Sequence, residues 1–223
     1  NEPEPPTPVT ELEKTPDEVL DEHPVSIQVN GEWQTFPNVK AAEKASYEEY
    51  KANLSRTAEN FRITDDHLGE GGPKAKFQAN VEAIKLLKYL EETTGQATPE
   101  QQQVLSRYVG WGGLAGAFDP DKESWSKEYA QLKELLTPEE YAAARGSTLN
   151  AHYTSPTVIK AIYEAVGRMG FETGNILEPS CGVGNFFGML PEEMRNSRLY
   201  GVELDSISGR IAQQLYPKAD ITV

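Results

Sequence analysis

A glycine-rich turn between two short apolar runs constrains the fold of this chain more than any other feature. Residues 175–177, Asn-Ile-Leu, are typical of a short buried strand. Residues 178–187 contain an acid, a proline and two closely spaced glycines, and a second, mostly apolar run at 199–203 ends on a carboxylate. A strand followed by a glycine turn that opens a helix is the first half of a strand–helix–strand unit with parallel strands. We therefore expect a parallel sheet in this part of the chain.

Helices and strands alternate throughout the segment that contains this turn. A helix is expected from Ser155-Pro156 to Gly170, further helices at 186–190 and 206–215, and a third strand at 220–223. This alternation is typical of α/β proteins. The predicted fold class is α/β: the front part of a Rossmann-like sheet, preceded by a helical region with a small β-hairpin. Because such sheets normally have more than three strands, we expect the chain to be the front part of a larger protein.

Three segments are expected along the chain. Residues 1–23 hold eight acids, one base and five prolines, which is typical of a solvated tail or linker. Residues 24–148 are expected to form a β-hairpin and a helical region. Residues 149–223 are expected to form the α/β part.

Local signals within residues 24–148 are specific. Asn30-Gly31 separates two alternating runs and predicts a type I′ hairpin, in which Trp33 and Phe36 should pack on a helix. Amphipathic periodicity predicts a helix over 78–94.

Two further helices are marked by capping boxes that begin at Thr98 and Thr137, each with proline at the first helical position. The first is expected to end near Val109 and the second at Gly146.

Composition restricts the class of partner. The chain has 35 acidic and 21 basic residues, a formal net charge of −14, so its surface as a whole repels phosphate backbones. A contact with nucleic acid therefore requires a local basic patch or a part of the protein outside this chain. The single cysteine, Cys181, excludes an intrachain disulfide and cysteine-based zinc sites. No apolar run is long enough to span a membrane and no signal peptide is recognisable, so a cytoplasmic location is expected.

The glycine turn also indicates which cofactor is bound. A dinucleotide fingerprint requires Gly-x-Gly-x-x-Gly, whereas Gly182, Gly184 and Gly188 have one extra residue before the third glycine. Glu178 precedes the turn, where a carboxylate would repel a pyrophosphate. S-adenosylmethionine has no phosphate and carries a sulfonium and an ammonium group, so its charge suits Glu178. Glu203, at the end of the next strand, is suited to the two ribose hydroxyls. We therefore expect S-adenosylmethionine rather than NAD.

The same residues resemble a known enzyme family. The run from Glu178 to Phe186, Glu-Pro-Ser-Cys-Gly-Val-Gly-Asn-Phe, is similar to the cofactor motif of adenine-specific DNA methyltransferases of the gamma class, which act on the exocyclic amino group. The run from Gly201 to Asp205 resembles their second motif, and residues 152–156 resemble their aromatic-Thr-Pro segment with one serine inserted. The resemblance implies that the cofactor is contacted by Tyr153, Thr154, Glu178, Pro179, Gly182, Gly184, Asn185 and Glu203.

A wider resemblance lies upstream. Phe61-Arg62-Ile63 and residues 108–113 are similar to very large methylase-helicase fusion proteins of bacterial mobile elements and phages. This resemblance implies a helicase farther along such a protein, and double-stranded DNA as the partner of the full-length protein.

One family motif is missing. The catalytic Asp/Asn-Pro-Pro-Tyr/Phe tetrapeptide, which holds the flipped base, does not occur in the chain. We therefore assign no catalytic and no metal-binding residue and expect the chain by itself to be inactive. Two alternatives remain: a non-catalytic interaction or regulatory module with a vestigial methyltransferase fold, and an NAD-dependent oxidoreductase. The incomplete sheet also predicts self-association through its edge.

Three other residues have a structural and a functional interpretation. Trp111, set among glycines, is either a core anchor or a stacking platform, and packing is favoured. Cys181 is expected to be a small buried side chain rather than a nucleophile. His152 is expected to be a structural neighbour of Tyr153 rather than a base.

Overall fold

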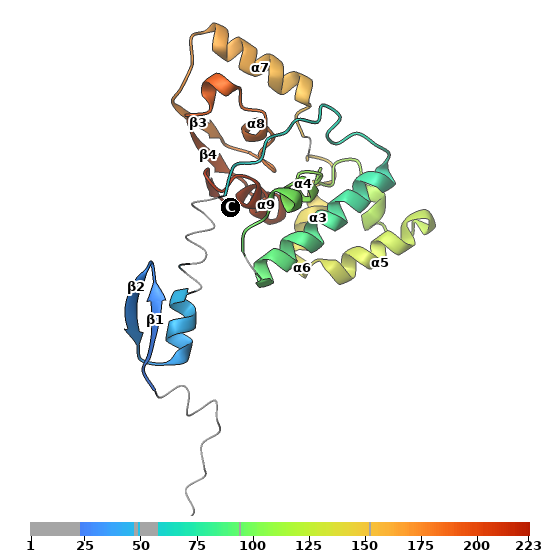
Figure 1. The fold of residues 1–223 in the computed structure, drawn as a ribbon. Helices are drawn as coiled ribbons and strands as arrows, with labels where there is room; N and C mark the ends of the chain where they lie inside the picture. The colour runs from blue at the N-terminus through green and yellow to red at the C-terminus, as the bar shows by residue number, and fades with distance from the viewer. Residues whose placement is uncertain (1–22, 47–48, 50–57, 94, 152) are drawn as a thin grey trace, which may run out of the picture. The chain divides into compact units, whose positions relative to one another are not determined.

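The structure is a computed structural model that describes residues 23–46, 49, 58–93, 95–151 and 153–223. The chain divides into two compact units, Asn1–Leu54 and Ser55–Val223 (Figure 1). The acidic tail expected at 1–23 lies outside the described residues except for its last position. The boundaries expected at 23/24 and 148/149 remain predictions.

The first unit contains the expected hairpin. Strands β1 (Val25–Val29) and β2 (Glu32–Phe36) pair antiparallel, and a helix covers residues 39–46. Asn30 and Gly31 have φ values of 53° and 80°, the two positive angles that a type I′ turn requires.

The expectation that Trp33 and Phe36 both pack on a helix is wrong for Trp33. The Trp33 side chain is 72% exposed, whereas Phe36 is half-buried. The two residues are three positions apart, and side chains alternate between the faces of a strand, so they point to opposite faces. One buried face can take only one of them.

The second unit begins with a helical region. Both capping boxes form: Thr98 and Thr137 each accept a hydrogen bond from the third helical N–H, and the Gln or Glu at that position bonds back. The helices of this region are α3 (Pro73–Thr93), α4 (Pro99–Leu105), α5 (Ser126–Leu135) and α6 (Pro138–Ser147), with short 3₁₀ turns η1 (Ala115–Phe118) and η2 (Glu123–Trp125).

Helix α4 ends at Leu105, four residues before the expected end, because of a buried asparagine. Asn80 on α3 accepts a hydrogen bond from the Val109 N–H (2.9 Å) and donates one to the Gly110 carbonyl (2.6 Å). These backbone groups are therefore bonded to a side chain instead of continuing the helix. Asn80 is fully buried and fixes the turn that follows Tyr108.

The α/β part consists of three strands and their connecting helices. Strands β3, β4 and β5 form one parallel sheet in the order β3-β4-β5. The elements are α7 (Pro156–Arg168), β3 (Asn175–Glu178), α8 (Asn185–Gly188), the 3₁₀ turn η3 (Glu192–Met194), β4 (Arg198–Val202), α9 (Ser206–Leu215) and β5 (Asp220–Thr222). The predicted mixture of a hairpin, helices and a parallel sheet is confirmed.

The two faces of this sheet differ in burial. Leu199, Gly201 and Ile221 on one face are buried, whereas Leu177 and Val202 on the other are 62% and 45% exposed. Among the described residues β4 is the central strand of this sheet, and β3 lies at an edge.

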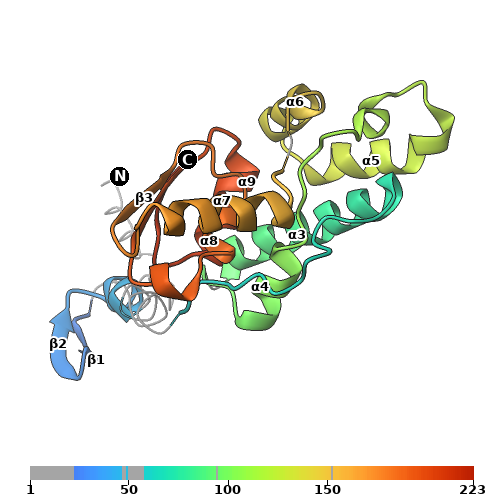
Figure 2. The ribbon, with the colours of Figure 1, turned by 90° about the horizontal axis from the view of Figure 1, so that it is seen from above.

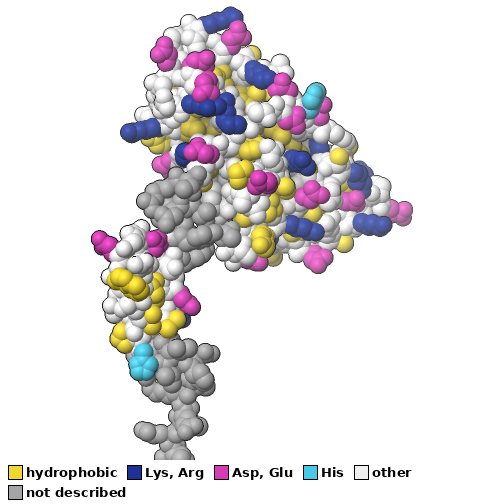
Figure 3. All heavy atoms as spheres, viewed as in Figure 1, with side chains coloured by type: hydrophobic (Ala, Val, Ile, Leu, Met, Phe, Trp, Pro, Cys, Tyr) yellow, Lys and Arg dark blue, Asp and Glu magenta, His cyan; other side chains and the backbone are white. Residues whose placement is uncertain are grey.

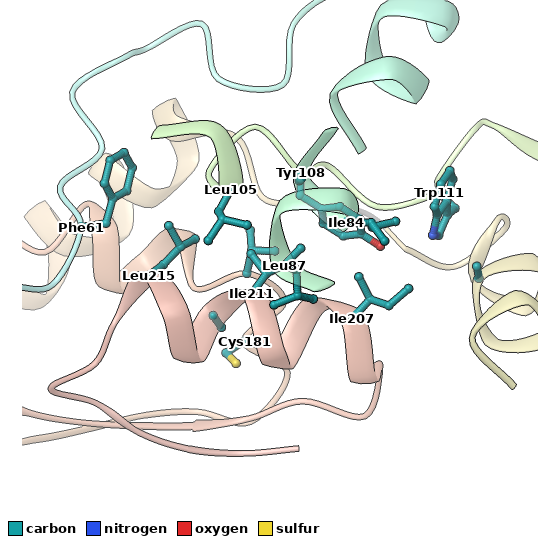
Figure 4. Close-up of a cluster of buried hydrophobic side chains, with 14 of the residues drawn as sticks. Phe61, Ile84, Leu87, Leu105, Tyr108, Trp111, Cys181, Ile207, Ile211 and Leu215 are labelled. Atoms are coloured by element: carbon teal, nitrogen blue, oxygen red, sulfur yellow. The ribbon is translucent and has the colours of Figure 1, made fainter. Parts of the chain in front are cut away.

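Helix α9 joins the helical region to the sheet. Its apolar residues Ile207, Ile211 and Leu215 pack with Leu87 of α3 and Leu105 of α4 in one core (Figure 4). In Figure 1, α9 and α3 lie between α7, at the top of this unit, and α5. Figure 2, seen from above, shows β3 and α5 at opposite ends of the unit.

An upstream strap crosses the same core. The Phe61 N–H donates to the Leu215 carbonyl (2.8 Å) and the Ile63 N–H to the Gly188 carbonyl (2.9 Å). Residues before α3 are thereby bonded to the ends of α8 and α9.

A charged cluster adds a second link at α9. Arg210 contacts Glu140 of α6 (2.5 Å) and Glu91 of α3 (2.9 Å), and Lys88 contacts Glu140 from its other side (2.9 Å). The pKa of the Glu140 carboxyl lies below its ordinary value of 4.5. Burial by itself raises this pKa, but hydrogen bonds from Lys88, Thr137 and Arg210 stabilise the ionised form by more than burial disfavours it.

We predict that Asn80→Ala lowers the free energy of unfolding by about 2–4 kcal/mol, because it leaves a buried N–H and a buried carbonyl without partners. Urea unfolding followed by circular dichroism measures this loss. Gln78→Ala, two residues earlier on the exposed side of α3, is the control and should change stability by less than about 0.5 kcal/mol. Equal effects of the two substitutions would contradict the role given to Asn80.

The Glu140 cluster predicts a pH dependence. Because the folded-state pKa of Glu140 is lowered, its ionised form stabilises the fold above the unfolded-state pKa, and this stability is lost as pH falls through the folded-state pKa. Glu140→Gln should therefore cost about 3 kcal/mol at pH 7, and the difference from the unsubstituted protein should shrink below about pH 4.5. Urea midpoints of both proteins across this range test it. Glu164→Gln, which breaks an exposed pair with Arg168, should change little at any pH.

Candidate functional site

A cavity of about 620 Å³ lies between the carboxyl ends of β3 and β4 and the helical region. Its lining includes six of the eight residues that the sequence assigned to cofactor binding: Tyr153, Thr154, Glu178, Gly182, Asn185 and Glu203. These residues come from three segments of the chain, 153–154, 178–185 and 203, and the parallel sheet brings the ends of two of its strands together. The other two, Pro179 and Gly184, do not line the cavity. The part that each of the eight takes in cofactor binding remains a prediction.

Glu203 is held by the glycine turn. Its carboxylate accepts hydrogen bonds from the Gly182 N–H (2.7 Å) and the Asp205 N–H (2.8 Å), one on each oxygen. The Cys181 N–H donates to the Val202 carbonyl (3.0 Å), which joins the turn to the end of β4. Because each carboxylate oxygen has two acceptor positions, Glu203 retains one on each oxygen for a ligand hydroxyl.

Glu178 is a half-buried carboxylate at the end of β3. Among the described residues it has no hydrogen-bond or ion-pair partner. Burial raises the pKa of its carboxyl, because desolvation disfavours the charged form. A cation placed beside Glu178 would remove this penalty, so the site favours positively charged ligand groups.

The Tyr153 ring packs between Gly110 and Gly182. A Cβ added to Gly110 would lie 2.6 Å from the Tyr153 ring, and one added to Gly182 would lie 2.9 Å from it. Both glycines also have positive φ, a conformation that other residues rarely adopt. Each turn therefore requires glycine for two reasons: its backbone conformation and the space that the Tyr153 ring occupies. The Tyr153 hydroxyl lies 3.1 Å from the Ser208 hydroxyl.

Asp205 completes this polar group at the start of α9. Its carboxylate accepts from both the N–H (2.8 Å) and the hydroxyl (2.7 Å) of Ser208. Asp205 and Ser208 line the cavity without having been predicted from the sequence. Their signal was the helix N-cap position two residues after the strand-end acid Glu203.

Gly184 belongs to the same glycine turn but does not line the cavity. It has a φ of 82°, and a Cβ there would lie 2.3 Å from the Tyr216 ring. Gly184 is the residue before α8, and its position allows the chain to turn directly into that helix. Pro179 is exposed.

The helical region supplies a wall of the cavity that sequence reasoning missed. Tyr108 and Trp111 line it, and each side chain is 1% exposed. Trp111 makes edge-on contacts with Phe77 and Phe118, which confirms its role as a core anchor. The sequence feature that could have predicted this wall is the presence of Tyr108 and Trp111 within two residues of Gly110, a glycine in a turn.

The remaining candidate groups are Cys181, His152 and possible metal ligands. Cys181 is buried as expected, and burial raises the pKa of its thiol to about 11, so it is not a thiolate at neutral pH. His152 lies outside the described residues. In the described part of the chain, no three His, Cys, Asp or Glu residues are grouped so that they could hold a metal ion, and no helix could span a membrane.

Sequence comparisons relate part of this chain to a methyltransferase. The type II methyltransferase M.CvrRI of Paramecium bursaria Chlorella virus XZ-6E is 38% identical over 61 residues, which are 27% of this chain and 16% of that protein. The defense against restriction protein B of Escherichia phage P1 is 26% identical over 155 residues, which are 70% of this chain and 5% of the phage protein. The chain therefore spans a small fraction of both relatives. No family model and no solved structure matches it.

We predict that Gly184→Ala destabilises the protein by about 3 kcal/mol, because it combines left-handed backbone strain with a clash against Tyr216. Gly146→Ala is the matched control: Gly146 lies within α6 and has no atom within 4 Å of the added Cβ. Helix propensity predicts that this control is neutral or stabilising by up to about 1 kcal/mol. Thermal and urea unfolding of both variants decide the comparison.

Proposed function

We propose that this chain is the cofactor-binding portion of an S-adenosylmethionine-dependent DNA methyltransferase. The observation that supports this most is the cavity in which Glu178, Gly182 and Glu203 meet, with one carboxylate held by backbone N–H groups and the other without a partner among the described residues. The sequence similarity to a type II methyltransferase supports the same class of reaction.

Each residue has a separate task in this proposal. Glu203 accepts hydrogen bonds from the ribose hydroxyls, and its orientation is fixed before binding by Gly182 and Asp205. Glu178 offsets the positive charge of the ligand in a half-buried site, where electrostatic attraction is stronger than in water. Gly182 lets the ligand approach the backbone. The cofactor, when bound, supplies an activated methyl group.

The reaction assigned to the larger protein is methyl transfer to the exocyclic amino group of adenine in double-stranded DNA. This assignment, the gamma class and the helicase fusion depend on the motif resemblance, because the Pro-Pro motif that positions the base is absent from this sequence. The phage relative, named for defense against restriction, supports a restriction-related role on a mobile element. In Figure 3, acidic and basic side chains are interspersed on the visible face of the second unit. Because the chain as a whole carries a formal net charge of −14, DNA contacts are assigned to the larger protein.

Two rival functions remain. The first is a non-catalytic module with a vestigial methyltransferase fold, which does not require the cavity to bind the cofactor. The NAD alternative requires a pyrophosphate beside Glu178, which has no cationic partner in the described structure. Self-association through the edge of β3 is a separate proposal and is checked by sedimentation.

Calorimetry of the chain with S-adenosylmethionine tests the proposal. We expect binding that is weakened about tenfold or more by Glu203→Ala and by Glu178→Gln, since each removes a charge-assisted contact. Glu172→Gln, at an exposed acid before β3, is the matched control and should leave the affinity unchanged.

The pH dependence has a definite sign. Because the pKa of Glu178 is raised, its charge and the affinity difference from Glu178→Gln are present above that raised pKa and are lost as pH falls through it. A folded protein that gives no heat with S-adenosylmethionine, or one that prefers NADH, would overturn the proposal.

A further inference from the structure

Three carboxylates line the cavity without a compensating cation. Glu178, Glu203 and Asp205 belong to its wall, and the described lining contains no Lys, Arg or His. Among the described residues none of the three forms an ion pair. The donors that reach Glu203 and Asp205 are neutral: backbone N–H groups and the Ser208 hydroxyl. The cavity therefore presents uncompensated negative charge to a ligand.

A buried carboxylate elsewhere in the same unit shows the contrast. Glu140 is 8% exposed and contacts two cations, Lys88 at 2.9 Å and Arg210 at 2.5 Å. Taking a carboxylate out of water is unfavourable unless a counter-ion accompanies it, and at Glu140 the protein supplies that counter-ion. At the cavity a ligand is left to supply it.

The two strand-end acids are neighbours in the sheet. Glu178, the last residue of β3, pairs with Gly201 of β4, and Glu203 follows two residues later. Adjacent strands of a sheet lie about 4.8 Å apart, and both carboxylates line the same cavity. A positive charge held beside Glu203 is therefore also attracted by Glu178.

The proposed cofactor carries two cationic groups, and only one of them is close to its ribose. The sulfonium sulfur is bonded to the 5′ carbon of the ribose, whereas the ammonium group is at the far end of the amino-acid chain. With the ribose on Glu203, the sulfonium is the cation nearest to the strand-end acids. It is also the charge that is lost in the reaction, because the electrons of the broken carbon–sulfur bond stay on sulfur and leave a neutral thioether.

We propose that the site distinguishes S-adenosylmethionine from its demethylated product by charge, and that Glu178 determines this specificity. The inference rests on the proposed function and adds a regulatory property of the same site. Loss of the sulfonium charge removes an attraction that is stronger in a half-buried site than in water. The product, S-adenosylhomocysteine, is therefore bound weakly and does not block the cavity for the next cofactor molecule.

Calorimetry with three ligands tests this specificity on the whole 223-residue chain. The buffer is kept on the alkaline side of neutrality, because burial raises the pKa of Glu178 and the test requires its ionised form. S-adenosylmethionine should bind about tenfold or more tightly than S-adenosylhomocysteine. Sinefungin, in which a carbon with a protonated amine replaces the sulfonium, should bind like S-adenosylmethionine. These comparisons require no variant.

Glu178→Gln keeps the size of the side chain and removes its charge. It should lower the ratio of the two affinities, S-adenosylmethionine over S-adenosylhomocysteine, by about threefold or more. Its urea midpoint without ligand should not fall, because Glu178 has no partner among the described residues. Glu172→Gln is the matched control: Glu172 is exposed and does not line the cavity, so the ratio should stay the same.

Each contrary outcome has a separate meaning. Equal affinities for S-adenosylmethionine and S-adenosylhomocysteine overturn the inference and leave the proposed function intact. If Glu178→Gln weakens both ligands by the same factor, Glu178 binds the ammonium group alone. If sinefungin binds like S-adenosylhomocysteine, the site recognises the methyl group and not the charge; both results overturn the inference. If the unsubstituted, folded chain binds none of the three ligands, the proposed function fails and the inference fails with it.

Discussion

The cavity depends on one packing arrangement, the Tyr153 ring inserted between Gly110 and Gly182. A side chain at either glycine would collide with the ring, so this single contact holds together the helical turn, the cofactor-type turn and the segment that precedes α7. The hydroxyl of the same tyrosine reaches Ser208, which is bonded to Asp205 at the start of α9. Four segments far apart in sequence are thereby brought to one place. A larger residue at either glycine is therefore expected to displace the ring.

Most local features were readable from the sequence because each depends on a few neighbouring residues. The hairpin turn follows from two residues that accept positive φ, and the capping boxes follow from a side chain and an N–H three positions apart. The meeting of Glu178, Gly182 and Glu203 was also predictable, because parallel strands end at the same edge of a sheet.

The features that the sequence did not reveal depend on distant contacts. The end of α4 is set by Asn80, a residue on another helix, and no local pattern marks a buried asparagine. The wall formed by Tyr108 and Trp111 arises only when the helical region packs on α9. The error at Trp33 has a different cause. Strand alternation already places Trp33 and Phe36 on opposite faces of the hairpin, but the prediction followed the hydrophobicity of both residues and not their spacing.

The shared core around α9 has a practical consequence for how this protein can be divided. Ile207, Ile211 and Leu215 are buried against helices that precede residue 149, and the Phe61 N–H is bonded to the last carbonyl of α9. A shorter fragment that began at residue 149 would present this apolar surface to water and leave Arg210 without its two carboxylate partners. Any excised piece that is to stay folded in solution must therefore start before Phe61, the first residue of the strap.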